Sequence, residues 1–176
     1  MSNWNTFYVQ RMGLDGQGVQ WPVKESVTEW GIFCKTIPFK LMGSVKKPAC
    51  QTWLDEDGDE EFIPSTGLLR ESYTIEIELG CKKLTASDST KYDVSVNDVR
   101  DKVAAFIGWL QSAGMIKLYS THTKIGRQYV RLESVPDDAT WKNDNGEEWL
   151  IFKIVMKVND PSTDIVYSGG SLVQRV

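Results

Sequence analysis

Apolar and polar residues alternate along most of this sequence, which is the period of a β-strand, and this pattern restricts the chain to mainly β folds. The clearest stretch is Tyr73–Leu79, where every second residue is apolar and the residues between are Thr or Glu. Trp149–Val158 is largely apolar on both faces, so we expect this strand to be central in its sheet or covered on its second face. Met115–Ser120, Arg127–Val135 and Trp30–Phe39 predict three further strands.

Only one segment has helical periodicity. Between Val96 and Gln111, apolar residues recur at i, i+4, i+7, i+8 and i+11, and these residues are Val99, Val103, Phe106, Ile107 and Leu110. Ser95 and Asp98 approximate a capping box, and Gly114 provides a left-handed stop. Trp109 lies beside the apolar stripe, at the edge of the core or at an interface. A single helix cannot supply repeated parallel crossovers, so we expect an α+β, mainly β fold: an antiparallel β-sandwich or barrel with one packed α-helix.

The segment Lys40–Leu69 is about 30 residues long and exceeds the usual length of a connection between strands. It contains Asp57-Gly58, a strong hairpin signal, and six carboxylates between Asp55 and Glu61. The sequence therefore predicts a long protruding β-hairpin with an acidic tip. We expect residues 1–160 to form one domain that includes this hairpin, and residues 161–176 to form a C-terminal tail that adds a strand to a neighbour or is partly mobile.

The charge is unevenly distributed along the chain. The net charge is −4, from 20 basic and 24 acidic residues. Leaving out Asp55–Glu61 and Asp137–Glu148 leaves 19 basic and 13 acidic residues, a remainder of +6. Acidic loops on a mildly basic body favour self-association over nucleic-acid binding, which needs a clustered basic face. Solvated turns explain the two acidic stretches equally well.

Enzyme and metal-site patterns are missing from the sequence. The three cysteines form no CxxC pair, and His122 is the only histidine, in a polar turn, so no nucleophile, base and orienting group can be assembled. The acidic run places Glu60 and Thr66 where a calcium-binding EF-hand loop needs Gly and Glu. Gly13–Gly18 reads as a turn, because no Lys-Ser/Thr and no helix follow it. We expect no catalytic, metal or cofactor site.

No apolar run reaches the ~18 residues that a membrane span needs, and the first residues lack a basic-then-apolar leader. We therefore expect no membrane association and a protein that is made inside a cell and kept there.

The order of these segments resembles tail proteins of long-tailed bacteriophages, especially the N-terminal ring domain of distal tail proteins and the related tail-tube subunits. The resemblance covers about Trp30–Pro161 and depends on pattern alone, without an invariant motif. The segments that carry it are the long insert Phe39–Leu69, the strand Arg70–Leu79, the helix with Phe106–Leu110 and Ser112–Gly114, and then Met115–Ser120, Gln128–Leu132 and Phe152–Pro161. Whether the chain resembles a tube subunit or a distal ring more closely stays open.

The resemblance implies a hexameric ring around a DNA channel, which the DNA passes without specific binding, in a virion tail assembled in the bacterial host cytoplasm with other tail proteins. We expect the acidic tip of one copy to meet a basic patch of another, because head-to-tail contacts close into rings. The candidate interface residues are Lys46, Lys47, Trp53, Asp55, Asp57, Asp59, Glu60, Trp109, Lys153 and Lys157. The alternative is a carbohydrate- or receptor-binding β-sandwich module that binds through exposed tryptophans such as Trp53 and Trp141.

Overall fold

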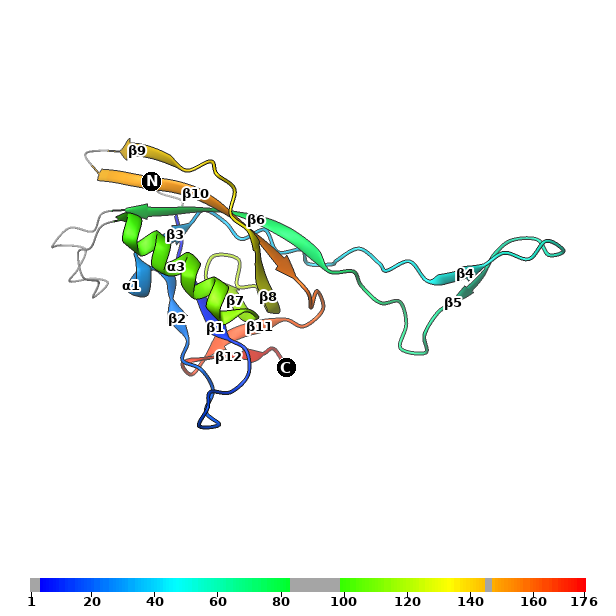
Figure 1. Cartoon of the computed structure of the whole chain (residues 1–176). Coiled ribbons are helices and arrows are strands. Elements are labelled where there is room, and N and C mark those ends of the chain that lie inside the picture. Colours follow the sequence, from blue (N-terminus) through cyan, green and yellow to red (C-terminus); the bar gives the residue numbers. More distant parts are fainter. Residues whose placement is uncertain (1–3, 83–98, 145–146) are drawn as a thin grey trace.

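The computed structural model describes residues 4–82, 99–144 and 147–176 (Figure 1). Within these residues, eight strands form one curled antiparallel sheet in the order β2-β1-β7-β8-β10-β6-β3, with β9 also paired to β10. The sheet strands are β1 (Phe7–Arg11), β2 (Lys24–Glu25), β3 (Ile32–Cys34), β6 (Tyr73–Lys82), β7 (Ile116–Ser120), β8 (Gly126–Ser134), β9 (Thr140–Asp144) and β10 (Glu147–Val158). Two hairpins complete the strands: β4 (Ala49–Gln51) with β5 (Glu60–Phe62), and β11 (Ile165–Ser168) with β12 (Ser171–Gln174).

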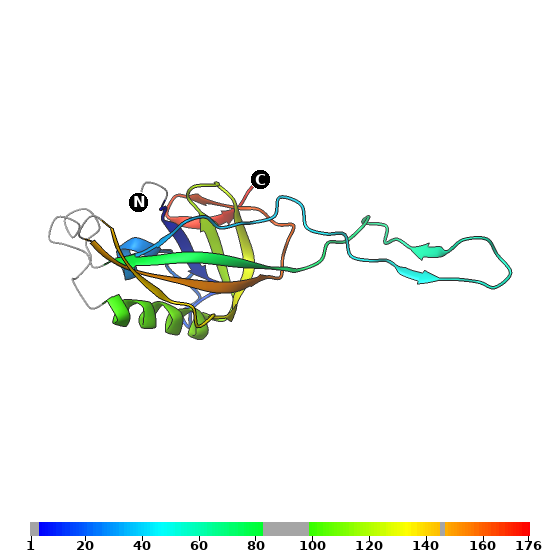
Figure 2. The ribbon, with the colours of Figure 1, turned by 90° about the horizontal axis from the view of Figure 1, so that it is seen from above.

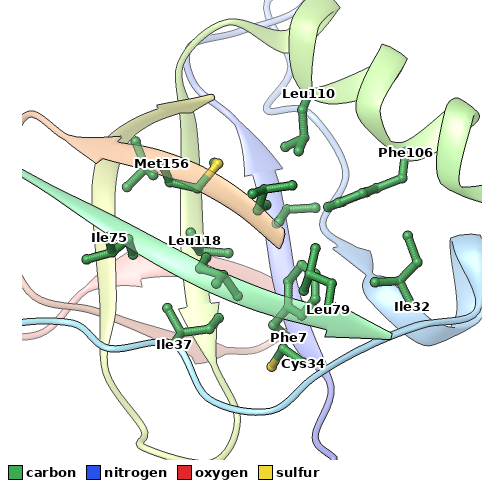
Figure 3. Packing of buried hydrophobic residues seen from close by; sticks show 14 of the residues in the cluster. Phe7, Ile32, Cys34, Ile37, Ile75, Leu79, Phe106, Leu110, Leu118 and Met156 are labelled. Atoms are coloured by element: carbon green, nitrogen blue, oxygen red, sulfur yellow. The ribbon is translucent and has the colours of Figure 1, made fainter. Parts of the chain in front are cut away.

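The helix α3 (Val99–Ala113) packs along the sheet and contributes to the main core (Figures 2 and 3). The spacing of Val99, Val103, Phe106 and Leu110 places one stripe of the helix against the strands, and all four side chains are buried. The ring of Phe106 meets Phe7 at 6.1 Å and Trp30 at 5.1 Å between centroids. The predicted α+β, mainly β fold with an antiparallel sheet, a packed helix and a protruding hairpin is confirmed.

The strand β10 is central in the sheet, as its two apolar faces predict. It pairs with β6 along ten residues on one side, and with β8 and β9 on the other. Its inner side chains, Phe152 to Val158 at every second position, belong to the main core. On the outer face, Trp149 and Ile151 are buried with Val27 and Phe33, and Trp4 stacks on Trp149 at 5.7 Å.

The predicted strand Trp30–Phe39 is wrong over much of its length. Trp30 ends a short helix, α1 (Ser26–Trp30), and only Ile32–Cys34 forms a strand. Gly31 adopts the left-handed conformation (φ 64°) and its N–H donates to Val27 O at 2.8 Å, which stops the helix and redirects the chain.

The C-terminal end of α3 agrees with the predicted stop at Gly114. Ser95 and Asp98, the predicted capping pair, lie outside the described residues. At the other end the helix runs two residues past Gln111, and Gly114 (φ 65°) then ends it as predicted.

The C-terminal residues fold onto the sheet as the β11–β12 hairpin. Ile165 and Leu172 are buried against Tyr119, and the turn uses Gly169-Gly170, both at positive φ. The hairpin approaches β8 so closely that a Cβ on Gly126 would lie 2.5 Å from Ile165 Cγ1. This contact requires a glycine at position 126.

Candidate interaction surface: the protruding arm

Residues 40–69 form a long extension, here called the arm, that leaves the body next to the start of β6 (Figures 1 and 2). Val45 pairs with Arg70 near its root, and Lys46 N–H donates to Leu69 O at 2.7 Å. Further out, β4 and β5 pair in the register Ala49 with Phe62. The arm is therefore a two-stranded ribbon with both outer edges unpaired within the described residues, which confirms the predicted hairpin.

The tip of the arm, residues 52–59, is held by bonds between its two sides. Thr52 Oγ1 donates to Asp59 Oδ1 at 2.6 Å, and Trp53 Nε1 donates to Glu60 Oε2 at 3.2 Å. Gly58 supplies the positive φ (92°) that the turn needs. The result is an ordered acidic tip from which Leu54 projects fully exposed to solvent.

The surface of the arm is unusually apolar for a part of the chain that faces solvent. Eight large aliphatic or aromatic side chains are each more than half exposed: Leu41, Met42, Val45, Leu54, Phe62, Ile63, Leu68 and Leu69. Contiguous exposed apolar surface marks sites of interaction in soluble proteins, because its transfer out of water is favourable. The arm is therefore a candidate interaction surface.

A pocket of about 150 Å³ lies between the two sides of the arm and is here called the arm pocket. Lys46 and Lys47 line it from one side, and its other lining residues are apolar: Pro48, Ala49, Phe62, Pro64, Leu68 and Leu69. A turn closed by Gly67 N–H to Pro64 O at 2.8 Å returns the chain to the ribbon and places Leu68 and Leu69 there. The arm pocket combines an apolar wall with two cations.

The root of the arm is fastened to the body on both sides. Ile37 and Phe39, just before the arm, are buried in the main core. Lys40 N–H donates to the hydroxyl of Tyr73 at 3.3 Å, and Lys40 Nζ lies 5.2 Å from the centre of the Tyr73 ring.

Arg127 connects the root of the arm to the C-terminal hairpin. Its guanidinium donates through Nη2 to Lys40 O at 3.1 Å and forms an ion pair through Nη1 with Asp164 Oδ1 at 3.0 Å. The Arg127 side chain is only 5% exposed. Sequence reasoning missed this residue, since a charged residue in a strand is ordinarily interpreted as facing solvent.

The structure brings most of the predicted interface residues together on the arm and leaves three on the body. Those on the arm are Lys46, Lys47, Trp53, Asp55, Asp57, Asp59 and Glu60. Trp109 is half-buried, with its ring 5.3 Å from that of Trp30, and Lys157 lies on β10 between Thr74 and Arg131.

Lys153 already has anionic partners within its own chain. Its Nζ lies 3.0 Å from Glu76 Oε1 and 3.8 Å from Asp138 Oδ2. The hydrogen bond and the charge of Glu76 raise the pKa of Lys153, so this cation is held in its charged form by its neighbours. An acidic tip from another copy would have to compete with these carboxylates.

The two exposed tryptophans, Trp53 and Trp141, lie far apart in the fold. Trp53 is at the tip of the arm, whereas Trp141 is on β9 at the opposite end of the body (Figure 1). They do not form one stacking platform for a sugar within a single chain.

The three cysteines give a direct readout of the exposure of the arm. Cys50 lies exposed on β4, while Cys34 and Cys81 are buried, and burial raises the pKa of each of these two thiols to about 12. We expect a maleimide to modify one thiol per native chain, and all three only after denaturation, because the thiolate is the reacting form. Mass spectrometry of peptides from wild type and Cys50→Ser checks this; modification of the native Cys50→Ser chain would contradict the packing described here.

In the parts of the chain that the structure covers, no three His, Cys, Asp or Glu side chains are grouped as they would be around a metal ion. Over the same residues, no helix combines the length and the apolarity that a membrane crossing requires.

The sequence and the mainly β fold were compared with known proteins. No family model and no curated protein matches the sequence. Among solved structures, the chain is similar to the Dit protein (gp 19.1) of bacteriophage SPP1, described as a paradigm of the hub adsorption apparatus in phages that infect Gram-positive bacteria. The sequences are 13% identical and the TM-score is 0.46; the match covers 92% of this chain and 52% of the Dit chain. This chain thus spans about half the length of that protein.

Proposed function

We propose that this chain is a non-enzymatic structural subunit of a phage or prophage tail, which assembles with copies of itself into a hexameric ring at the tail tube or the distal tail. One observation carries the self-assembly: the arm stands free of the body with eight large apolar side chains more than half exposed. Fully burying such a side chain contributes roughly 1.5–3 kcal/mol, and an isolated subunit leaves more than half of each of these side chains in water. A neighbouring subunit that covers the arm would bury this surface, and the assembly would gain the corresponding free energy.

Head-to-tail contact through the arm is compatible with a closed ring. The arm leaves one end of the body (Figure 2). In the proposed ring it contacts a neighbour through a different surface from the one that the neighbour offers in return. Contacts of this head-to-tail kind close into rings when the rotation between subunits permits it. The assignment to a phage tail, the ring size and the other tail proteins as partners come from the resemblance in the order of strands, helix and long insert.

Within such a ring, DNA passes through the channel without specific binding. The chain has more acidic than basic residues, 24 against 20, so its net charge does not attract phosphates. A wall that attracted phosphates would hold the DNA through the release of counterions, whereas an acidic wall does not.

Removal of the arm tests this proposal. Val45 and Arg70 are paired, so replacing residues 46–69 by Asn-Gly gives a two-residue turn that closes the root of the ribbon. We expect the full chain to form rings in electron microscopy and sedimentation velocity, and the shortened chain to sediment as a monomer with the same far-ultraviolet circular dichroism of the body. Rings formed by the shortened chain would contradict the proposal, and so would a full chain that stays monomeric at every concentration.

A further inference from the structure

We infer that the arm pocket of one copy receives the arm tip of the next copy, with Leu54 as the inserted side chain and the carboxylates around it facing Lys46 and Lys47. This inference rests on the proposed function, because it takes the arm as the surface between copies. It adds the acceptor of the tip, and with it the pairing that links one subunit to the next.

The apolar parts of the tip and the pocket match. Leu54 projects from the tip without contact to its own chain's core, and the arm pocket of about 150 Å³ has walls that include Phe62, Pro64 and Leu68. A cavity of about that volume lined by aliphatic and aromatic side chains holds a molecule of benzene, which is larger than the isobutyl group of leucine.

The charges of the tip and the pocket match as well. Asp55, Glu56 and Asp57 follow Leu54 directly in the sequence, and Lys46 and Lys47 line the pocket. Opposite charges placed around an apolar anchor orient the two partners and speed their encounter. Lys153, the other cation considered for this role, is engaged by Glu76 and Asp138 of its own chain.

A tip cannot reach the pocket of its own arm. Leu54 is five residues beyond Ala49, which lines the pocket, and an extended strand advances about 3.3 Å per residue, so the two lie roughly 17 Å apart along the ribbon. The β4–β5 pairing keeps Ala49–Gln51 extended, and the bonds from Thr52 to Asp59 and from Trp53 to Glu60 continue the ribbon towards the tip. A tip that enters this pocket therefore comes from another copy, and a head-to-tail series of such contacts is compatible with a ring.

An exchange of charges between two variants tests the pairing. In the reversed-pocket chain, Lys46→Glu and Lys47→Glu make the pocket acidic. In the reversed-tip chain, Asp55→Lys, Glu56→Lys and Asp57→Lys make the tip basic. Asp59 and Glu60 are left unchanged, so they keep their bonds to Thr52 and Trp53. Each variant alone brings like charges together, so we expect its self-association to weaken about tenfold or more. An equimolar mixture pairs opposite charges at every contact and restores assembly. A mixture that associates no better than its components overturns the inference.

Leu54 is tested separately from the charges. We expect Leu54→Ala to weaken self-association about tenfold, as the loss of most of a buried aliphatic side chain predicts. Leu14→Ala is the matched control, since Leu14 is an exposed leucine on a turn of the body. Equal dissociation constants for Leu54→Ala and the control chain overturn the role of Leu54.

A disulfide between copies locates the contact. The variant carries Leu54→Cys and Ala49→Cys in a Cys50→Ser background. Positions 49 and 54 lie too far apart within one chain for a disulfide, which needs Cα atoms within about 7 Å. We expect oxidation to give covalent oligomers with these two cysteines, and none when Leu14→Cys replaces Leu54→Cys. If the arm-less chain is monomeric but neither the mixture nor the disulfide behaves as expected, the inference fails and the proposed function stands. If the arm-less chain forms rings, the proposed function fails first.

Discussion

Replacing Phe106 by Ala should lower the free energy of unfolding by about 3–5 kcal/mol, the usual range when a fully buried aromatic side chain is removed from a core. Phe106 is 1% exposed and sits in the middle of the α3 stripe, between Phe7 and Trp30. The surrounding strands are fixed by their pairing, so they cannot collapse into the space that is left. Urea unfolding followed by circular dichroism at equilibrium measures the loss.

Gly108→Ala is the matched control for this helix. Gly108 lies on the exposed side of α3, and a Cβ added there meets no atom within 4 Å. Alanine is favoured over glycine inside a helix by about 1 kcal/mol, so this variant should be more stable than wild type. The two substitutions on one helix should therefore have opposite signs; a Phe106→Ala loss below about 1 kcal/mol would contradict the packing of α3 on the sheet.

The second large effect concerns Arg127. Replacing it by Met should cost about 2–3 kcal/mol of stability, because the Lys40 carbonyl loses its donor and Asp164 loses its buried partner. The expected loss is below that of a fully buried ion pair, since the Asp164 side chain is 31% exposed and also contacts Arg175. Urea unfolding gives the stability, and hydrogen exchange should show faster exchange in β11 and near Lys40.

Arg175→Met isolates the contribution of burial. Arg175 approaches the same carboxylate at 3.4 Å, but its side chain is 63% exposed. Ion pairs in such positions contribute less than about 1 kcal/mol. Equal losses of stability for Arg127→Met and Arg175→Met would show that the burial of Arg127 does not increase its contribution.

Much of the fold follows from the sequence because its longest elements have one strong period. Leu79 and Ile77 alternate with glutamates, and Phe106 and Leu110 repeat at helical spacing, so tertiary packing and local pattern agree. The short helix α1 escaped prediction because five residues cannot display a period. Its Trp30 reads equally well as a strand residue, and the left-handed Gly31 decides between the two.

Prediction of the candidate site was less complete. The length of Lys40–Leu69 and its Asp57-Gly58 turn indicate the hairpin and its charged tip. The arm pocket does not follow from them, because Phe62 and Leu68 come together only through the turn closed by Pro64 and Gly67. A hollow on a ribbon depends on the path of the backbone between the strands, which no periodicity encodes.

The shared bonding of Arg127 also couples the arm root to the C-terminal hairpin. The root of the arm and the C-terminal hairpin are held by the same guanidinium, through Lys40 O and Asp164. Arg127 belongs to β8, so the arm root and the C-terminal hairpin are both anchored to the main sheet at this one residue. Loss of its guanidinium would therefore loosen the arm root and the hairpin together.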